Sequence, residues 1–276
     1  MLKHKVLGHI RTYSRETRDE IIIVAHEFLE TIGISVELID EMTNNLLSCV
    51  DEIIKNAVKA NYKYLLIVEE MQKRFEKEYP EKNEKEIKEL IRNIVKDQGT
   101  FDKIADTIVK NCNISKHVRE ILNEEAKFLS IKNKVYLEKR DFSVAEIEKI
   151  KQLKEINRIR SRLKENDVKI VLKIQSDEDF IYVEVMNTAP ILTKDLERIY
   201  NKRDEYQKYK EKHIEHEFFI NNLDTSESGF GLGYATIDSF LSDWGLDSIR
   251  SLTIISSIDT TVLMTLPIEQ ISSNIM

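Results

Sequence analysis

Apolar residues in the first 80 positions recur every three or four residues, a spacing typical of amphipathic helices. We expect one helix from about 18 to 32, with Gly33 as its stop signal. A second helix should run from about 35 into the sixties, and the same period continues to Pro80. Its apolar face comprises Leu38, Met42, Leu46, Val50, Ile53, Ile54, Ala57 and Val58.

Residues 81–165 are polar, nearly free of glycine and again helical in their periodicity. Amphipathic stripes lie at 87–95, 104–109 and 144–156. Such stripes either pack within one protomer or pair with a helix of a second chain, and their spacing allows both. We expect the helical part from 143 to 165 to extend for about 34 Å and to project from the rest of the domain.

The period changes from three or four to two after Asn166, which indicates strands. The polar stretch 202–228 has no clean period and is expected to form a mobile loop. The expected elements are strands at 168–174 and 181–185, helices at 193–201 and 230–242, and strands at 251–257 and 260–267. Helices followed by antiparallel strands with one inserted helix predict an α+β fold, built as a two-layer α/β sandwich.

Composition narrows the class of protein. The formal charge of −7 argues against a nucleic-acid partner, because such proteins need a net basic face. No apolar run approaches the roughly 20 residues that span a bilayer, so we expect no membrane segment. Two cysteines, Cys49 and Cys112, fit reduced thiols in a cytoplasmic protein rather than a disulfide or zinc scaffold.

A first candidate site lies in the second helix. Glu52 and Asn56 are four residues apart, so both side chains leave the same face of the helix. A carboxylate there can orient or deprotonate a nucleophile, and an amide oxygen can ligate Mg²⁺. The alternative is an ordinary solvated helix surface.

Two later segments carry candidate chemistry. Asn187 ends a strand in YVEVMNTAP, where its amide can pair with a base edge, although a simple turn before Pro190 is the alternative. The glycines of GFGLG open a helix, where they allow phosphate to approach backbone N–H groups. These are three of only seven glycines in the chain, which favours a specific demand on the backbone over loop flexibility.

In order and spacing, these segments resemble the GHKL ATPases, the histidine-kinase-like family of sensor histidine kinases, anti-sigma-factor kinases, gyrase and heat-shock chaperones. DEIIKNAVKA resembles the N box, GFGLGYA the second glycine box and DTTVLMTLP the final strand. The matching positions are Glu52, Asn56 and Ala57, then Gly229, Gly231, Leu232 and Gly233, then Thr260 and Thr261. The resemblance covers about 1–61 and 166–268.

This resemblance implies an ATPase domain at 1–61 and 166–276, interrupted by a helical insertion at 62–165. It implies ATP or ADP as the ligand and Mg²⁺ as the cofactor, with Asn56 holding the metal and Glu52 acting catalytically near the γ-phosphate. The stretch 202–228 would be the lid. The implied nucleotide-binding residues are Asn56, Asn187, Gly229, Gly231, Leu232, Gly233 and Thr261.

The chain departs from the family at the first glycine box. Asn187 stands where the family has aspartate, and Ala189 and Ile191 replace two glycines. Asparagine keeps an acceptor for the adenine amino group and adds a donor for N1, so adenine is expected over guanine. The larger side chains remove the close passage of the backbone beneath the nucleotide, and Ile191 is expected to narrow the pocket.

The insertion replaces what is a short connection in typical members of the family. We expect it to stand apart from the pocket and to bind a protein partner or a second copy of the chain. The segment around His26 superficially resembles a phosphoacceptor motif, but it lies too close to Glu52 to leave room for a separate dimerisation domain. His26 is interpreted as a partly buried helix histidine, and His213 and His216 as loop residues.

Two main functions follow from these features. The first is an ATP-binding signalling protein, either a soluble protein kinase or a phosphorelay ATPase module that acts on a partner protein. The second is a non-catalytic regulator with a degenerate nucleotide site, whose insertion mediates association. Glu52, Asn56 and Gly229–Gly233 favour the first, whereas Ala189 and Ile191 favour the second. A third alternative is an unrelated α+β domain with coincidental motifs.

Overall fold

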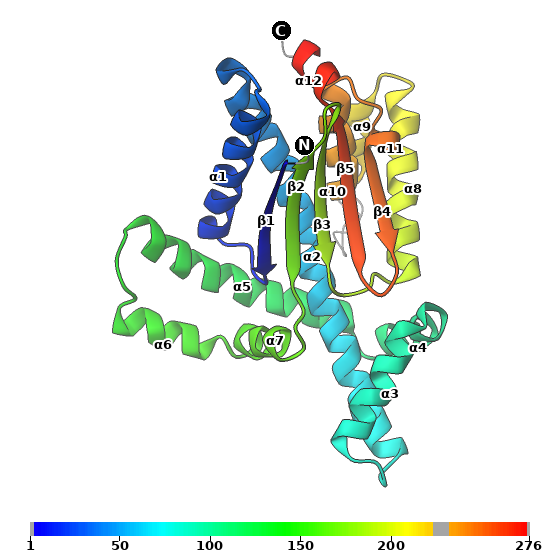
Figure 1. Cartoon of the computed structure of the whole chain (residues 1–276). Helices are drawn as coiled ribbons and strands as arrows, with labels where there is room; N and C mark the ends of the chain where they lie inside the picture. Colours follow the sequence, from blue (N-terminus) through cyan, green and yellow to red (C-terminus); the bar gives the residue numbers. More distant parts are fainter. Residues whose placement is uncertain (1–2, 223–231, 275–276) are drawn as a thin grey trace.

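The computed structural model describes residues 3–222 and 232–274, with one open antiparallel sheet and many helices (Figure 1). The sheet has five strands in the order β1-β2-β3-β5-β4. Their bounds are β1 (Lys3–Ile10), β2 (Ile170–Ser176), β3 (Phe180–Asn187), β4 (Leu252–Ser256) and β5 (Thr260–Pro267). The predicted α+β class is confirmed, and the four predicted strands are present. Strand β1 was not expected, because the first quarter of the chain was predicted to be helical only.

Strand residues alternate between a buried and a partly exposed face, as the period of two predicted. In the β2–β3 pair Leu172 lies opposite Val185, and both are buried. Lys173 and Glu184 pair on the other face and are partly exposed. Helices α1 and α2 pack against the buried face, and in Figure 1 α2 and α10 run behind the sheet.

Helix α1 (Arg15–Ile32) has defined caps at both ends. The Ser14 hydroxyl accepts a hydrogen bond from the backbone N–H of Thr17, which satisfies one of the free donors of the first turn. Gly33 follows the helix with φ of 89°, a left-handed conformation that glycine adopts at little cost. The predicted stop at Gly33 is therefore confirmed.

Helix α2 (Val36–Glu78) is 43 residues long, which corresponds to about 65 Å. It passes behind the sheet and continues beyond it among the helices of the predicted insertion (Figure 1). Those helices are α3 (Glu84–Lys96), α4 (Gln98–Asn111), α5 (Ile114–Leu137), α6 (Val144–Gln152) and α7 (Lys154–Glu165). The sequence from 143 to 165 is not one projecting helix, because Leu153 leaves helical geometry with ψ of 76° and separates α6 from α7.

The remaining helices are α8 (Thr193–Lys210), α9 (Glu215–Asn222), α10 (Leu232–Asp243), α11 (Ser248–Ser251) and α12 (Ile268–Asn274). The prediction of a loop at 202–228 is wrong for 202–222, most of which belongs to α8 and α9. Residues 223–228 lie outside the described residues. The helical period was missed because Arg203, a charged residue, occupies the buried face of α8, where its guanidinium bonds both carboxylate oxygens of Asp238 in α10.

Within 3–222 and 232–274, no helix combines the length and the apolar character needed to cross a bilayer.

Candidate functional site

A pocket opens between α2, the ends of β3 and β5, and the helices α8 and α10. Its cavity volume is about 30 Å³, within an empty volume of about 400 Å³ that includes the open mouth. The lining is mostly apolar, with a few amide and hydroxyl groups. The lining residues are Ile53, Asn56, Ala57, Ala60, Val185, Asn187, Ile191, Ile199, Tyr234, Thr260 and Val262.

The beginning of α10 lies directly against the Glu52 and Asn56 pair. A Cβ atom added to Gly233 would lie 2.5 Å from Glu52 Oε2 and 2.8 Å from Asn56 Nδ2, so both side chains would have to shift to admit it. Glycine allows this approach without such a shift, and it places the first turn of α10 beside both side chains. The N-terminal end of a helix carries a partial positive charge, which favours negative groups beside this turn.

Asn56 is 5% exposed, and its side-chain nitrogen has no hydrogen-bond partner among the described residues. Buried amides are normally bonded, so this N–H donor fits an acceptor atom of a ligand beside it. Glu52 is more accessible, with 31% of its side chain exposed, and its Oε1 lies 3.5 Å from the Lys55 ammonium. The pair therefore combines a buried amide with a reachable carboxylate.

Asn187 ends β3 on the opposite wall and is buried. Its amide nitrogen donates to the Ala57 carbonyl at 3.5 Å, and its oxygen accepts from the Ala189 N–H at 3.4 Å. Both bonds are at the long limit of normal geometry, so a better partner can replace them at little cost. The structure thus brings the predicted residues Asn56, Asn187 and Gly233 together.

The threonine in the pocket is Thr260 rather than Thr261. Thr260 is buried, lines the pocket and donates from Oγ1 to the Ala189 carbonyl at 3.0 Å. Thr261 follows it in β5 and therefore points to the other face of the sheet, where its strand partner is Met186. The structure does not bring Thr261 to the pocket.

Other predicted residues lie elsewhere. Gly229 and Gly231 lie outside the described residues. Leu232 begins α10 and packs against the cluster of Tyr206, Phe218 and Ala235, away from the pocket lining.

Tyr234 and Ile199 line the pocket although the sequence analysis did not single them out. Burial raises the pKa of Tyr234, so its hydroxyl stays neutral at ordinary pH. Its position directly after the glycine box is the signal that would have identified it. Ile199 offered no such signal beyond the helical spacing of α8.

Ala189 and Ile191, where the sequence departs from the expected glycine pattern, form a buried wall. Ala189 is fully buried, and Ile191 is 8% exposed with its side chain in the pocket lining. The Gln98 side chain of α4 donates to the Ile191 carbonyl at 3.1 Å. The expectation that 62–165 stands apart from the pocket is therefore wrong, because α4 holds part of the pocket wall.

Asp51 precedes Glu52 and faces α1 instead of the pocket. Its carboxylate accepts hydrogen bonds from the Tyr13 hydroxyl and, at 3.1 Å, from Arg18 Nε. Burial raises the pKa of Asp51 to about 6, the neighbouring Glu52 adds to the rise, and Lys55 opposes it. These hydrogen bonds hold α2 against α1 and the residues before it.

Three histidines, His26, His213 and His216, drew attention in the sequence. His26 is 39% exposed and lies 3.6 Å from Glu30 and 3.7 Å from Asp40. His213 lies in the turn between α8 and α9 with φ of 57°, while His216 belongs to α9 rather than to a loop. No group of three metal-ligating side chains occurs in the part of the chain that the structure describes.

Comparison of the chain with protein-family models, with curated proteins and with solved structures found no match.

Proposed function

We propose that this chain binds an adenine nucleotide together with Mg²⁺ in the pocket between α2 and α10, as a signalling protein of the histidine-kinase-like ATPase type. The observation that supports this most strongly is the contact of Gly233 with Glu52 and Asn56. Two segments about 180 residues apart, picked out by separate motifs, meet at one point beside an apolar pocket that also contains Asn187.

The layout of the site suggests how the ligand lies. Phosphates would occupy the end near Glu52, Asn56 and the N-terminus of α10, where N–H groups favour anions. The base would occupy the apolar part between Ala57 and Asn187, whose amide offers a donor and an acceptor. Asn56 would hold Mg²⁺, which when bound neutralises phosphate charge.

Glu52 would act at the phosphate end of this site. Its partly exposed carboxylate is positioned to orient an incoming hydroxyl or imidazole toward the γ-phosphate. The proposal therefore includes a soluble kinase or phosphorelay module acting on a protein partner. An open antiparallel sheet with helices packed on one face is consistent with the two-layer sandwich of the GHKL family, which is part of the same proposal.

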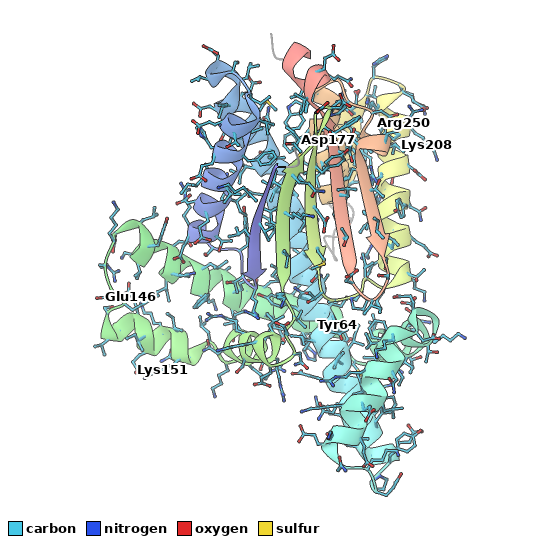
Figure 2. All side chains as sticks on the ribbon, viewed as in Figure 1. Tyr64, Glu146, Lys151, Asp177, Lys208 and Arg250 are labelled. Carbon is cyan, nitrogen blue, oxygen red and sulfur yellow. The ribbon has the colours of Figure 1, made fainter. Side chains whose placement is uncertain are left out.

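The second candidate is a non-catalytic regulator whose helical insertion mediates association. It is favoured by the arm formed by α5 and α6, on which Figure 2 labels Glu146 and Lys151 away from the sheet. Helix α6 has no buried residue, and Leu137, Val144 and Ile147 are 63%, 78% and 41% exposed near the turn that joins the two helices. Exposed apolar groups gathered in this way are typical of contact surfaces.

Calorimetric titration of the full chain with ATP, ADP and GTP, with and without Mg²⁺, tests the proposal. We expect adenine nucleotides to bind with micromolar to millimolar affinity, about −4 to −8 kcal/mol. GTP should bind more weakly, because guanine presents two donors to the Asn187 amide, and Asn187→Asp should reduce this preference. Tighter binding of GTP than of ATP would contradict the assigned role of Asn187, and absence of all nucleotide binding would favour the regulator.

A further inference from the structure

A second hollow adjoins the pocket, with an empty volume of about 300 Å³ including its opening. It is apolar and aromatic, with one polar end where the Lys63 ammonium pairs with the buried Asp195 carboxylate. Its lining residues are Ala60, Lys63, Tyr64, Ile67, Phe101, Pro190, Ile191, Leu192 and Asp195. We call this space the rear hollow, and the pocket that contains Asn56 and Asn187 the front pocket.

The two spaces lie end to end along α2. The helix lines the front pocket with residues from 53 to 60 and the rear hollow with residues from 60 to 67. Glu52, against which Gly233 packs, precedes both. Along α2, the proposed phosphate end of the site comes first, the part of the front pocket proposed for the base comes next, and the rear hollow follows.

Ile191 and Ala60 are the two residues that line both spaces. Alanine is too small to separate them, so the Ile191 side chain forms the division. Its backbone is fixed by the hydrogen bond from Gln98 to the Ile191 carbonyl, which ties the division to α4. In the family pattern this position is glycine, which could not form a division at all.

The walls of the rear hollow suit an aromatic group. Phe101 of α4 is fully buried, and its ring centroid lies 6.0 Å from that of Tyr64, in a tilted arrangement. Figure 2 labels Tyr64 where α2 leaves the sheet and approaches α3 and α4. Rings at this separation make favourable aromatic pairs, and an aromatic group that widened this cavity of about 20 Å³ would gain the same kind of contact.

We propose that Ile191 is a specificity-determining residue that closes the base end of the site and so selects purines without a substituent on the edge opposite the sugar. This rests on the proposed nucleotide function. In this arrangement the 6-amino group of a bound adenine, on the ring edge farthest from the sugar, would give one hydrogen to the Asn187 amide and direct the other toward the rear hollow. A bulky group on that nitrogen meets Ile191, and a smaller side chain at 191 joins the two spaces and admits it.

The experiment measures binding of ATP and of N6-benzyl-ATP to the full-length protein and to Ile191→Ala. The matched control is Leu192→Ala, the next residue, which is buried to a similar extent but lines only the rear hollow. Native protein should bind ATP at least about tenfold more tightly than the benzyl analogue. Ile191→Ala should bind the analogue about tenfold more tightly than native protein does, and Leu192→Ala should show no such gain.

Several outcomes distinguish this inference from the proposed function. If native protein binds no ATP, the proposed function itself fails. If native protein binds ATP and N6-benzyl-ATP equally well, the proposed role of Ile191 is wrong while nucleotide binding stands. The same conclusion follows if folded Ile191→Ala binds ATP but has no higher affinity for N6-benzyl-ATP than native protein has. Ile191→Val, which removes a single methylene, provides a second variant that should show a smaller gain if Ile191→Ala does not fold.

Discussion

At Gly233, a methyl group has no space, because both Glu52 and Asn56 occupy the position where it would lie. Gly233→Ala should weaken binding of Mg·ATP by about tenfold or more, since either side chain must move from the site. Folding stability should change by less than about 1 kcal/mol, because alanine favours the helix and the Glu52 side chain, the nearer of the two, is partly accessible and can move aside. Calorimetry and urea unfolding measure the two effects.

Gly99→Ala is the matched control for that substitution. Gly99 also lies in the first turn of a helix, and an added Cβ would meet only Asp97 Oδ1 at an ordinary 3.6 Å. Unchanged nucleotide binding by Gly233→Ala, or an equal loss in Gly99→Ala, would contradict the placement of the phosphate end beside α10.

Asp51 should make stability depend on pH in a defined direction. Its folded pKa of about 6 lies above the ordinary value of 3.8, so the folded state holds the proton more tightly than the unfolded chain. The contribution of protonated Asp51 to the unfolding free energy is therefore fully present below about pH 4. It is lost as the pH rises to about 6. Relative to Asp51→Asn, native protein should lose about 1 to 2 kcal/mol of unfolding free energy from pH 4 to pH 7, after allowance for solvent screening.

Urea unfolding at both pH values measures this difference. Asp97 serves as a control of opposite sign, because hydrogen bonds from Thr100 lower the pKa of this exposed N-cap carboxyl. Relative to Asp97→Asn, native protein should gain stability as the pH rises through the acidic range. If the unfolding free energy of native protein, relative to Asp51→Asn, rose from pH 4 to pH 7, burial could not be the main influence on the pKa of Asp51.

Single residues also show where sequence reasoning is limited. Glu52, Asn56, Asn187 and Gly233 could be found from sequence because spacing along one helix and turn-forming glycines leave a visible pattern. Choosing between Thr260 and Thr261 required the face of the strand, and a shift of one residue reverses that face. The buried Val262 in the same alternation as Thr260 supports the observed choice.

At the scale of elements, α8 shows why a buried helix face can escape detection. Its buried residues have helical spacing, but two of them are charged: Asp195, Ile199, Arg203 and Tyr206. Asp195 pairs with Lys63 of α2, and Arg203 with Asp238 of α10. An apolar-period analysis treats such positions as surface, so the helix was predicted to end near 201 and a loop to follow.

Strand β1 escaped detection for a different reason. It lies at the edge of the sheet, Val6 is 57% exposed, and the pairing with β2 shifts between Leu7 and Ile10. An edge strand of this kind needs no regular alternation of apolar residues. Its partner is also more than 150 residues away, and pairing over that distance leaves no local signal.

The N-terminus of α8 depends on a carboxylate from α4. Leu192 precedes the helix and cannot cap it, whereas Asp102 accepts hydrogen bonds from the Thr193 N–H at 3.2 Å and the Thr193 hydroxyl at 2.6 Å. Asp102→Ala should therefore lower the unfolding free energy by about 1 kcal/mol, the usual cost of a lost cap. Asp106→Ala removes only an ion pair with the exposed Lys194 and should cost less, about 0.5 kcal/mol. Equal effects in urea unfolding would contradict the capping role.

For the whole molecule, α2 joins the sheet and the insertion into one body. Residues of both regions belong to one continuous apolar core. The buried Tyr62 hydroxyl also donates to Glu125 of α5 at 2.5 Å, and burial raises the pKa of that carboxyl. The boundary predicted between 61 and 62 therefore falls inside the unbroken helix α2. The periodicity of the sequence could not show that one helix belongs to both regions.

We therefore expect the chain to unfold in one cooperative transition. The single tryptophan, Trp244, is buried near the sheet and reports on that part of the molecule, while far-ultraviolet circular dichroism is dominated by helices, many of them in the insertion. The two signals should share one midpoint in urea, as expected for a two-state transition. Separate midpoints would show that the insertion folds as its own unit.

The central claim is that α2 and α10 form a Mg·nucleotide site, and Asn56→Ala tests it most directly when compared with Asn61→Ala. Both asparagines lie in α2, both are buried, and both have amide atoms without hydrogen-bond partners among the described residues, but only Asn56 lines the front pocket. In calorimetry, Asn56→Ala should weaken the binding of Mg·ATP by about tenfold or more and that of metal-free ADP by less than about threefold. Asn61→Ala should change the affinity for either ligand by no more than about threefold. Equal losses of Mg·ATP and ADP in Asn56→Ala would remove the metal role of Asn56, and absence of Mg·ATP binding by the native protein would contradict the site itself.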